Sequence, residues 1–571
     1  MKNTNIFFSL LLTIFVMVST GFVAADDYSD LFGKTGSSGD TGLNGSNNDD
    51  AKNSKTSNNS TDMKHEFKLF GESSFNFYIP VIPDHQVLEG NIRRIDFDNE
   101  IGLSYEFIKS NISLIYLVSN WNIAIKLDSK GFSTDNIEVV PLENYIGFNL
   151  WKFNIKAGYI YHQWGTADKI NPSDMLNPRD FSTGVDADKM SVLSLVTSFE
   201  PVDQFKVEVV YVPFYQESAF PVDFKDNVPQ ALFYGMSNDS TSDPFDIPGT
   251  VIHAKNIDEK NYKFDLSRPV IGAKLNFRVP KTEFSFGYIY DFDQYYTPTI
   301  TMARDLFNIP LAGPYALYRI EKMTLERKRV HRINADFKTV IDDFGFWLEG
   351  SYMMTEDYDL SSYKIRNHKL SFVTGFDYRF GPDRDFYFNI QYLGEFIPGF
   401  DTGFYSDYKD GLPENSKTHD KSYMEKYYYR AITDQMGLYQ AGFEQGLAIF
   451  AEFPFYAGPV KLKPSFSAVY TIPLLYDYSH EERYGSLYLN TEFAVEPFES
   501  LKIVVGANLF FSWVKYKQVD QYMKQIVNDG SENNDYIDSI IQNEKDKIGI
   551  FKNDAGIYLA ISYKWDIMLV K

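Results

Sequence analysis

The strongest constraint on the fold is an alternation of apolar and polar residues with a period of two, which recurs from residue 64 to the end of the chain. A period of two places alternate side chains on opposite faces of a β-strand. One segment alternates Phe284, Phe286, Tyr288, Tyr290 and Phe292 with Ser285, Gly287, Ile289 and Asp291. We count about eighteen such segments, at residues 66–79, 93–108, 111–127, 137–150, 152–163, 190–200, 203–213, 267–279, 282–293, 330–340, 343–355, 366–380, 384–396, 441–455, 458–473, 484–495, 499–514 and 555–570.

The connections between these segments alternate strictly in length. Short ones fall at 109–110, 151, 201–202, 280–281, 341–342, 381–383, 456–457 and 496–498, and long ones at 80–92, 128–136, 164–189, 214–266, 294–329, 356–365, 397–440, 474–483 and 515–554. A transmembrane up-and-down barrel has short periplasmic turns and long outer loops. The sequence therefore predicts an all-β fold, a transmembrane antiparallel up-and-down β-barrel of about 18 strands (16–18). A secreted β-sandwich gives no reason for alternating loop length, and a β-helix would show a fixed repeat.

Composition agrees with strands that face lipid on one side. Aromatic residues are 17% of the chain, yet its mean hydropathy is -0.30, because every second residue of a barrel strand faces the lumen. No apolar run of about 18 residues follows the N-terminus, which argues against a helical membrane protein. The net charge of -22 disfavours nucleic acid as a partner, and the absence of cysteine excludes disulfides and thiolate sites.

The N-terminus predicts export. Residues 1–25 combine Lys2, an apolar core and a small-residue end at Ala24-Ala25, as in a cleaved signal peptide; the alternative is a retained anchor. Residues 26–64 form a polar, acidic stretch that is predicted to be a disordered periplasmic tail. The barrel is expected over residues 65–571.

A barrel of this size is wide enough for an aqueous channel. Charged residues at predicted inward positions are Lys156, Lys206, Glu208, Arg332, Asp336 and Lys338. They serve either ordinary solvation and ion pairing in a wet pore or selection of solutes. Inward aromatic residues are expected at Trp347, Tyr387, Phe510 and Tyr558, as a stacking track for sugars or a path for apolar compounds.

The third long loop contains the most distinctive motif of the chain. Its candidate constriction residues are Trp164, Gly165, Asp168, Asn171, Pro172, Asp174, Asn177, Pro178, Arg179 and Asp180. Two Asn-Pro steps impose turns, and Asn side chains bond their own backbone. Such a loop either folds inward and narrows the pore or caps the strands; both readings stay open.

This motif resembles the Trp-Gly-x-x-Asp-x-(Ile/Leu)-Asn-Pro-x-Asp-x-x-Asn-Pro-Arg-Asp signature of porin-like bacterial outer-membrane barrels grouped as a domain of unknown function. The resemblance implies an outer-membrane location and a channel for hydrophobic or other small compounds. One departure concerns the end of the chain. Leu569-Val570-Lys571 replaces the terminal aromatic residue that the barrel-assembly machinery, an expected partner, reads.

The sequence contains no common enzyme signature. The chain lacks a Gly-x-Ser-x-Gly elbow and a phosphate-binding loop, and its eight histidines have no metal-ligand spacing. We therefore expect no catalytic residue, no metal and no cofactor. The long loops are expected to contain short helices at 421–439, 518–526 and 536–542 and a turn at 303–307.

The leading functional hypothesis is an outer-membrane channel of a Gram-negative-type envelope, whose partners are membrane lipid and a small-molecule solute that diffuses passively. One alternative is a surface barrel that binds a ligand through the loops at 214–266, 397–440 and 515–554. The other is a plugged barrel that imports hydrophobic compounds. The sequence does not distinguish solute charge, an open from a plugged lumen, or monomer from trimer.

Overall fold

The computed structural model describes the strands of the chain and part of its loops. The described residues are 63–80, 94–109, 112–127, 137–167, 170–180, 188–219, 257–259, 265–309, 313–381, 385–400, 442–475, 480–516 and 555–567, with short pieces between 408 and 429. The predicted signal peptide and nearly all of the predicted tail lie outside these residues, as do the helices expected at 518–526 and 536–542.

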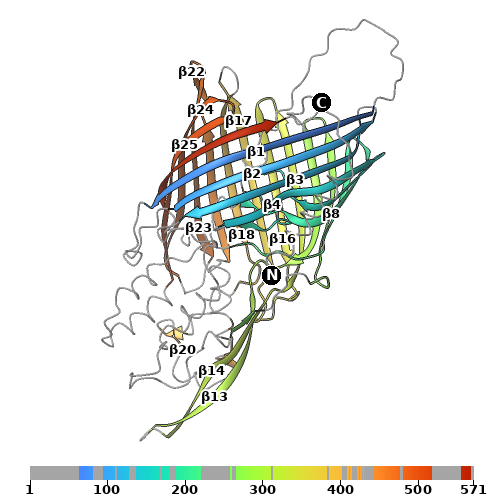
Figure 1. Cartoon of the computed structure of the whole chain (residues 1–571). Coiled ribbons are helices and arrows are strands. Elements are labelled where there is room, and N and C mark those ends of the chain that lie inside the picture. Colours follow the sequence, from blue (N-terminus) through green and yellow to red (C-terminus); the bar gives the residue numbers. More distant parts are fainter. Residues whose placement is uncertain are drawn as a thin grey trace, which may run out of the picture.

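One antiparallel sheet closes on itself to form a barrel (Figure 1). β1 (Met63–Pro80) pairs with β2 (Arg94–Lys109) on one side and with β26 (Gly556–Ile567) on the other, so the first and last strands seal the wall. The remaining wall strands are β3 (Ile112–Leu127), β4 (Ile137–Leu150), β5 (Phe153–Ile160), β8 (Val192–Val202), β9 (Phe205–Val212), β11 (Val270–Val279), β12 (Thr282–Phe292), β15 (Arg329–Ile341), β16 (Phe344–Met354), β17 (Lys369–Phe380), β18 (Phe386–Phe396), β21 (Phe443–Glu452), β22 (Phe455–Ala457), β23 (Val460–Leu475), β24 (His480–Phe498) and β25 (Leu501–Tyr516).

The wall has eighteen positions, as the sequence predicts. The sheet contains nineteen strands, but β21 and β22 both pair with β23 and form one position. Pro454, which has no N–H to donate, separates the two pieces, and the wall continues because Phe453 N donates to Pro464 O (3.0 Å). Every predicted segment corresponds to a wall strand, so the predicted fold class is confirmed.

The two faces of the wall have opposite character. Phe286 in β12 is 55% exposed on the outer face, whereas its neighbour Ser285 is 3% exposed on the inner face. Ile333 and Leu348 are likewise exposed outside, with Asn334 and Glu349 buried inside. An outer surface of this kind needs an apolar surrounding, because a water-soluble protein exposes such side chains only singly. No helix within the described ranges is long and apolar enough to cross a lipid bilayer.

Short turns occupy one rim of the barrel, at the top of Figure 1. Trp151, Lys281 and Asp342 each lie in such a turn with φ of 55°, 65° and 55°. Two-residue hairpin turns need this left-handed backbone to match the twist of the strands that they join. These three non-glycine residues therefore adopt a slightly strained backbone, which the tight hairpins require.

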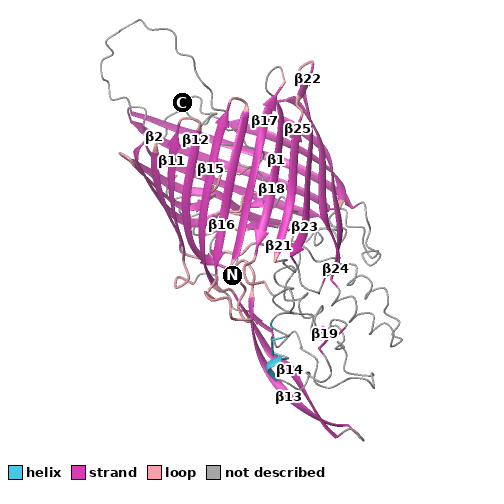
Figure 2. Ribbon diagram, turned by 180° about the vertical axis from the view of Figure 1, so that it is seen from behind, coloured by secondary structure: helices cyan, strands magenta, loops and turns pink. Residues whose placement is uncertain are grey.

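The opposite rim carries a long hairpin that the sequence interpretation missed. β13 (Thr297–Ile309) pairs with β14 (Gly313–Glu326), and β10 (Ile257–Glu259) adds a parallel strand to β14. The hairpin projects beyond the rim, as seen from both sides (Figures 1 and 2). The turn expected at 303–307 is wrong, because these residues are part of β13. Pro298 is compatible with this strand since β13 lies at the edge of its small sheet.

The smaller elements lie in the long loops. β6 (Arg179–Asp180) pairs with β7 (Asp188–Lys189), and β19 (Tyr408–Lys409) pairs with β20 (Leu412–Pro413). The described residues between 421 and 429 are helical, in agreement with the helix expected there, and the rest of that helix lies outside the described residues.

Candidate functional site

The stretch from residue 161 to 180, which we call the inward segment, leaves β5 and enters the barrel. Trp164 is 1% exposed, and its indole Nε1 donates to Glu208 Oε1 of β9 at 2.9 Å. Glu208 lies on the inner face, since its neighbour Val209 is exposed on the outer face. The segment therefore packs against the inner wall and not over the rim.

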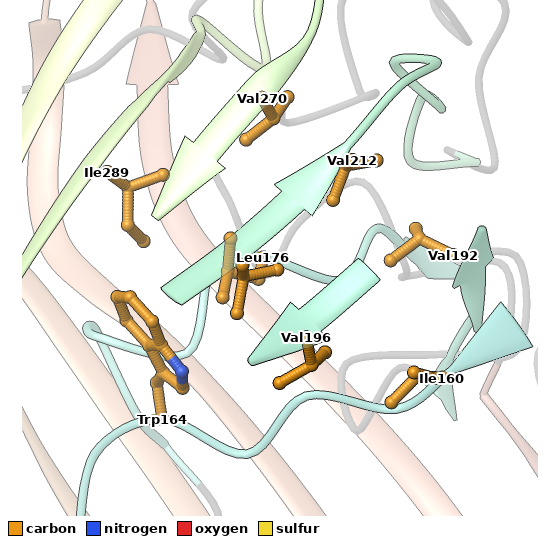
Figure 3. Packing of buried hydrophobic residues seen from close by; sticks show 9 residues of the cluster. Ile160, Trp164, Leu176, Val192, Val196, Val212, Val270 and Ile289 are labelled. Atoms are coloured by element: carbon orange, nitrogen blue, oxygen red, sulfur yellow. The ribbon is translucent and has the colours of Figure 1, made fainter. Parts of the chain in front are cut away.

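Two glycines of the wall make room for the Trp164 ring. A Cβ atom at Gly272 of β11 would lie 2.9 Å from Cη2 of Trp164, and one at Gly287 of β12 would lie 3.2 Å from Cζ3. Apolar side chains of the segment and the wall complete the packing, and Trp164, Leu176, Ile289 and Val270 belong to one buried cluster (Figure 3). Burial of a tryptophan in this way fixes the height at which the segment crosses the barrel.

The side chain of Glu349 in β16 holds the inward segment by accepting hydrogen bonds from the backbone of the segment. Its Oε2 accepts from the N–H groups of Thr166 (2.8 Å) and Ala167 (3.0 Å), and its Oε1 accepts from Ser173 N (2.8 Å). The carboxylate is completely buried. Sequence reasoning did not select Glu349, although an inward carboxylate that alternates with Leu348 was a signal that pointed to it.

Only a glycine fits at position 165, beside the carboxylate of Glu349 (the Glu349 clamp), for two reasons. Its φ of +86° is in the left-handed region, where an L side chain is strained. A Cβ there would also lie 2.5 Å from Glu349 Oε2. The first Asn-Pro step follows: Asn171 Oδ1 accepts from Ser173 N (3.1 Å), and Asn171 Nδ2 donates to Trp164 O (2.9 Å). This is the local backbone bonding expected of the motif, with Pro172 half-buried between the two residues.

The second Asn-Pro step ties the segment to its own ends. Asn177 Oδ1 accepts from His162 N (2.6 Å), while Asn177 Nδ2 donates to Ile160 O (3.2 Å) and Met190 O (2.8 Å). Pro178 is buried, and its carbonyl accepts from Met190 N (2.8 Å). The amide of Asn177 thus closes the segment into a compact loop.

Asp174 is the buried charge of the motif. It is 3% exposed, pairs with Arg179 at 3.4 Å and also pairs with Lys189. Asp180 lies opposite Asp188 in the short β6–β7 ladder. Asp168, the remaining acidic residue of the motif, lies outside the described residues. The structure therefore brings nine of the ten motif residues into one loop, with Asp174 paired to cations inside it.

The inward segment also reaches the far side of the barrel. Ile170 packs against a buried cluster on β21, β23, β24 and β25, which consists of Ala448, Val469, Tyr488 and Phe510 together with Ala555 before β26. Since Trp164 packs on β9, β11 and β12, the segment extends from one wall to the wall opposite. These two contacts divide the ring of wall strands into two sides, β15 to β18 on one and β26 to β8 on the other.

The two sides differ in exposure. Between β16 and β21 the inner residues Glu349, Asn389, Gln391 and Ala448 have no exposed surface. Along β26 and β1 the inner side chains of Lys564 and Glu72 are 68% and 31% exposed. Solvent therefore reaches Glu72 and Lys564 on the β26 and β1 side, where Lys564 N also donates to Ser500 O of a short turn.

The predicted lumen charges face the interior and are largely engaged. Lys206 pairs with Glu208 at 2.9 Å, and Lys274 pairs with Asp336 at 3.5 Å. Arg332 lies 3.8 Å from Asp291, and Lys156 lies over the Tyr145 ring at 5.0 Å. Lys338 lies opposite Glu283 and Trp347 in the sheet. A role of these residues in selecting solutes stays a prediction.

His162 lies just beyond β5 at the start of the inward segment. It is 4% exposed, and its Nε2 lies 3.1 Å from Ser194 Oγ. Burial lowers the pKa of His162 to about 4, against the attraction of Glu208, which would raise it. The imidazole is neutral at pH 7 and belongs to the packing of the segment.

The sequence matches no family model and no curated protein. The structure is similar to that of Pseudomonas aeruginosa OccK5 (OpdH), with 10% identity, a TM-score of 0.40, and coverage of 88% of this chain and 98% of that chain. For Acinetobacter baumannii OccAB1 the identity is 8%, the TM-score 0.42 and the coverage 88% and 97%. For the outer membrane channel DcaP of Acinetobacter baumannii they are 11%, 0.33, and 88% and 97%. These likenesses concern the fold alone, and the strand pairing of the chain already defines the closed barrel.

Proposed function

We propose that the protein is an outer-membrane channel through which small solutes diffuse passively, with the inward segment as its constriction. The observation that carries this proposal is the segment itself. It crosses the interior of a closed barrel and is bound to one wall through Trp164 and Glu349 and to the other through Ile170. On the β26 and β1 side of the inner wall, the charged side chains of Lys564 and Glu72 are 68% and 31% exposed. The width of such a constriction limits the size of the solutes that pass, and the charge of its lining selects among them by their charge.

The outer surface supports a lipid environment. Aromatic and aliphatic side chains such as Phe286, Ile333 and Leu348 are exposed there, and transmembrane barrels present an apolar band of this kind. An outer-membrane barrel over residues 65–571, preceded by a signal peptide and a periplasmic tail, is part of the proposal. Membership of the porin-like family with the motif at 164–180 is also part of it.

Conductance in planar lipid bilayers tests the function. The purified full chain is expected to give defined open steps, and persistent silence of correctly folded barrels would contradict a diffusion channel. Replacement of residues 164–180 by a short Gly-Ser linker is expected to raise the conductance, because it removes the crossing segment. A matched deletion of residues 358–361 in the rim loop between β16 and β17 is expected to leave the conductance unchanged. Equal conductance of all three proteins would show that the inward segment is not the constriction.

A further inference from the structure

We propose that the inner wall formed by β1, β2 and β3 holds a binding site for the ammonium group of a positively charged organic solute, centred on Asp98, Glu100 and Asn120. We call it the acidic wall site. It rests on the proposed channel function and adds to that function the chemical class of the solute. The site lies outside the inward segment, on strands from which the sequence analysis selected no residue.

The strand register places these groups on the inner face. In β2 the outer positions are Phe97 and Ile101, which are 38% and 41% exposed, so Asp98 and Glu100 face inward. Across the ladders, Glu100 lies opposite Glu72 of β1 and Asn122 of β3. Both carboxylates of β2 are half-buried on the side of the interior where solvent reaches the wall.

The charge of this wall is poorly compensated. Glu72 and Glu100 face each other directly across a strand pair, an arrangement of like charges that destabilises a sheet. Glu72 has Lys564 at 3.4 Å. Among the side chains that the structure describes, Asp98 and Glu100 form no ion pair and receive only amide N–H groups. Asp98 accepts from Asn76 (3.3 Å) and Asn122 (3.4 Å), and Glu100 accepts from Asn120. Amides hydrogen-bond a carboxylate without neutralising its charge.

A second observation is independent of the charges. Asn120 is 8% exposed, and its Oδ1 is fully buried and has no hydrogen-bond donor. The Oδ1 atom of Asn122 is in the same state. Both oxygens belong to amides whose nitrogens bond the carboxylates, so they lie beside the carboxylates. A buried acceptor without a donor costs about 1–3 kcal/mol, and native proteins rarely leave one without a reason.

The missing partner must supply N–H or O–H donors and positive charge together. An ammonium group has three donors and one positive charge, which matches carboxylate and amide oxygens on one wall. A metal ion fits less well, because no three acidic or histidine side chains converge as a ligand set within the described part of the chain. The acceptors are arranged along two strands, as suits donors that are spaced along an organic solute.

The experiment compares two solutes of equal length and opposite charge in proteoliposomes that contain the full chain. The probes are 1,4-diaminobutane and succinate. The wild-type protein is expected to pass the diamine faster than succinate, with a rate that saturates. The double variant Asp98→Asn/Glu100→Gln keeps the hydrogen-bonding shape and removes both charges. Its diamine rate is expected to fall by about tenfold, while its succinate rate stays the same or rises.

The control variant Glu200→Gln/Glu283→Gln also removes two charges. Both residues pair with Arg278 near the short-turn rim, at 3.6 Å each. Because they lie away from the acidic wall site, this control variant is expected to leave the diamine rate unchanged. Equal losses in the control and in the double variant would overturn the acidic wall site, as would a wild-type protein that conducts ions without favouring the diamine. Absence of conductance from folded wild-type barrels would instead contradict the proposed channel function. If the double variant does not fold, Glu100→Gln alone is expected to lower the diamine rate by about threefold, and an unchanged rate would overturn the site.

Discussion

The two sides of the barrel interior handle charge in opposite ways. On the walls where the inward segment packs, two buried carboxylates have strong partners: Glu349 receives three backbone N–H groups, and Asp336 has Lys274. Unpartnered buried atoms occur on these walls too, at Arg332 Nε and Asn334 Oδ1. On the β1 and β2 wall, Asp98 and Glu100 receive only amide groups, and the Oδ1 atom of Asn120 has no donor. A buried carboxylate that receives several backbone N–H groups or a cation holds its surroundings in one structure, whereas a half-buried carboxylate without a cation keeps its charge for attraction at a distance. The first wall holds the segment, and the second carries the proposed acidic wall site.

The largest expected effect is on the clamp at Glu349. Glu349→Ala leaves the backbone N–H groups of Thr166 and Ala167 without their acceptor, each worth about 1–3 kcal/mol, whereas Ser173 N keeps Asn171 Oδ1. We expect the inward segment to detach, which raises the conductance and its noise. Single-channel recording measures this effect. Glu283→Ala, at an exposed inner position near the turn, is the control. If Glu349→Ala shows the same conductance and the same low noise as the wild-type protein, Trp164 holds the segment without Glu349.

The next effect is a pH dependence that comes from His162. Its pKa is about 4 in the folded protein and about 6.5 when unfolded, so the unfolded chain binds more protons between these values. Folding stability therefore falls as the pH drops from about 6.5 to 4, by about 3 kcal/mol in total. His162→Gln should lose this share of the pH dependence. Denaturant midpoints of both proteins at pH 7 and pH 4 measure it, and parallel curves would place no titration at His162.

A smaller effect is expected at the glycine beneath the tryptophan. Gly272→Ala puts a methyl group 2.9 Å from the Trp164 ring, and overpacking of this kind costs about 1–3 kcal/mol. The Trp164 fluorescence and the conductance should change together. At Gly350 an added Cβ would meet only Ser371 O at 3.9 Å, so Gly350→Ala is the matched control. If the two variants show the same fluorescence and the same conductance, Trp164 is not tightly packed against Gly272.

The smallest effect concerns the second wall. Lys564 is 68% exposed and lies 3.4 Å from Glu72, so Lys564→Gln should change the folding stability by less than about 1 kcal/mol. It should raise the preference of the channel for cations, as measured by the reversal potential in a salt gradient. The rise should shrink at 1 M salt, where the screening length is about 3 Å. An unchanged reversal potential would mean that this wall does not set the selectivity.

The sequence alone predicted the wall of the barrel. Strand alternation and loop length are local properties, so eighteen strands and their facing could be read without any knowledge of contacts. The hairpin of β13 and β14 was missed because Pro298 reads as a break in the chain, and only its edge position in a small sheet makes the strand possible. The motif at 164–180 was recognised as constrained, but its two possible placements could not be separated.

Tertiary structure decided what the interior does. Glu349 meets Thr166, and Ile170 meets the cluster that contains Tyr488, only because the closed barrel brings distant strands around one segment. The pairing of Glu72 with Glu100 depends on the register between β1 and β2, which no local pattern specifies. A period of two fixes which face a side chain takes, since it follows from the geometry of one strand. Its partner across the lumen follows from closure and register, which are properties of the whole sheet.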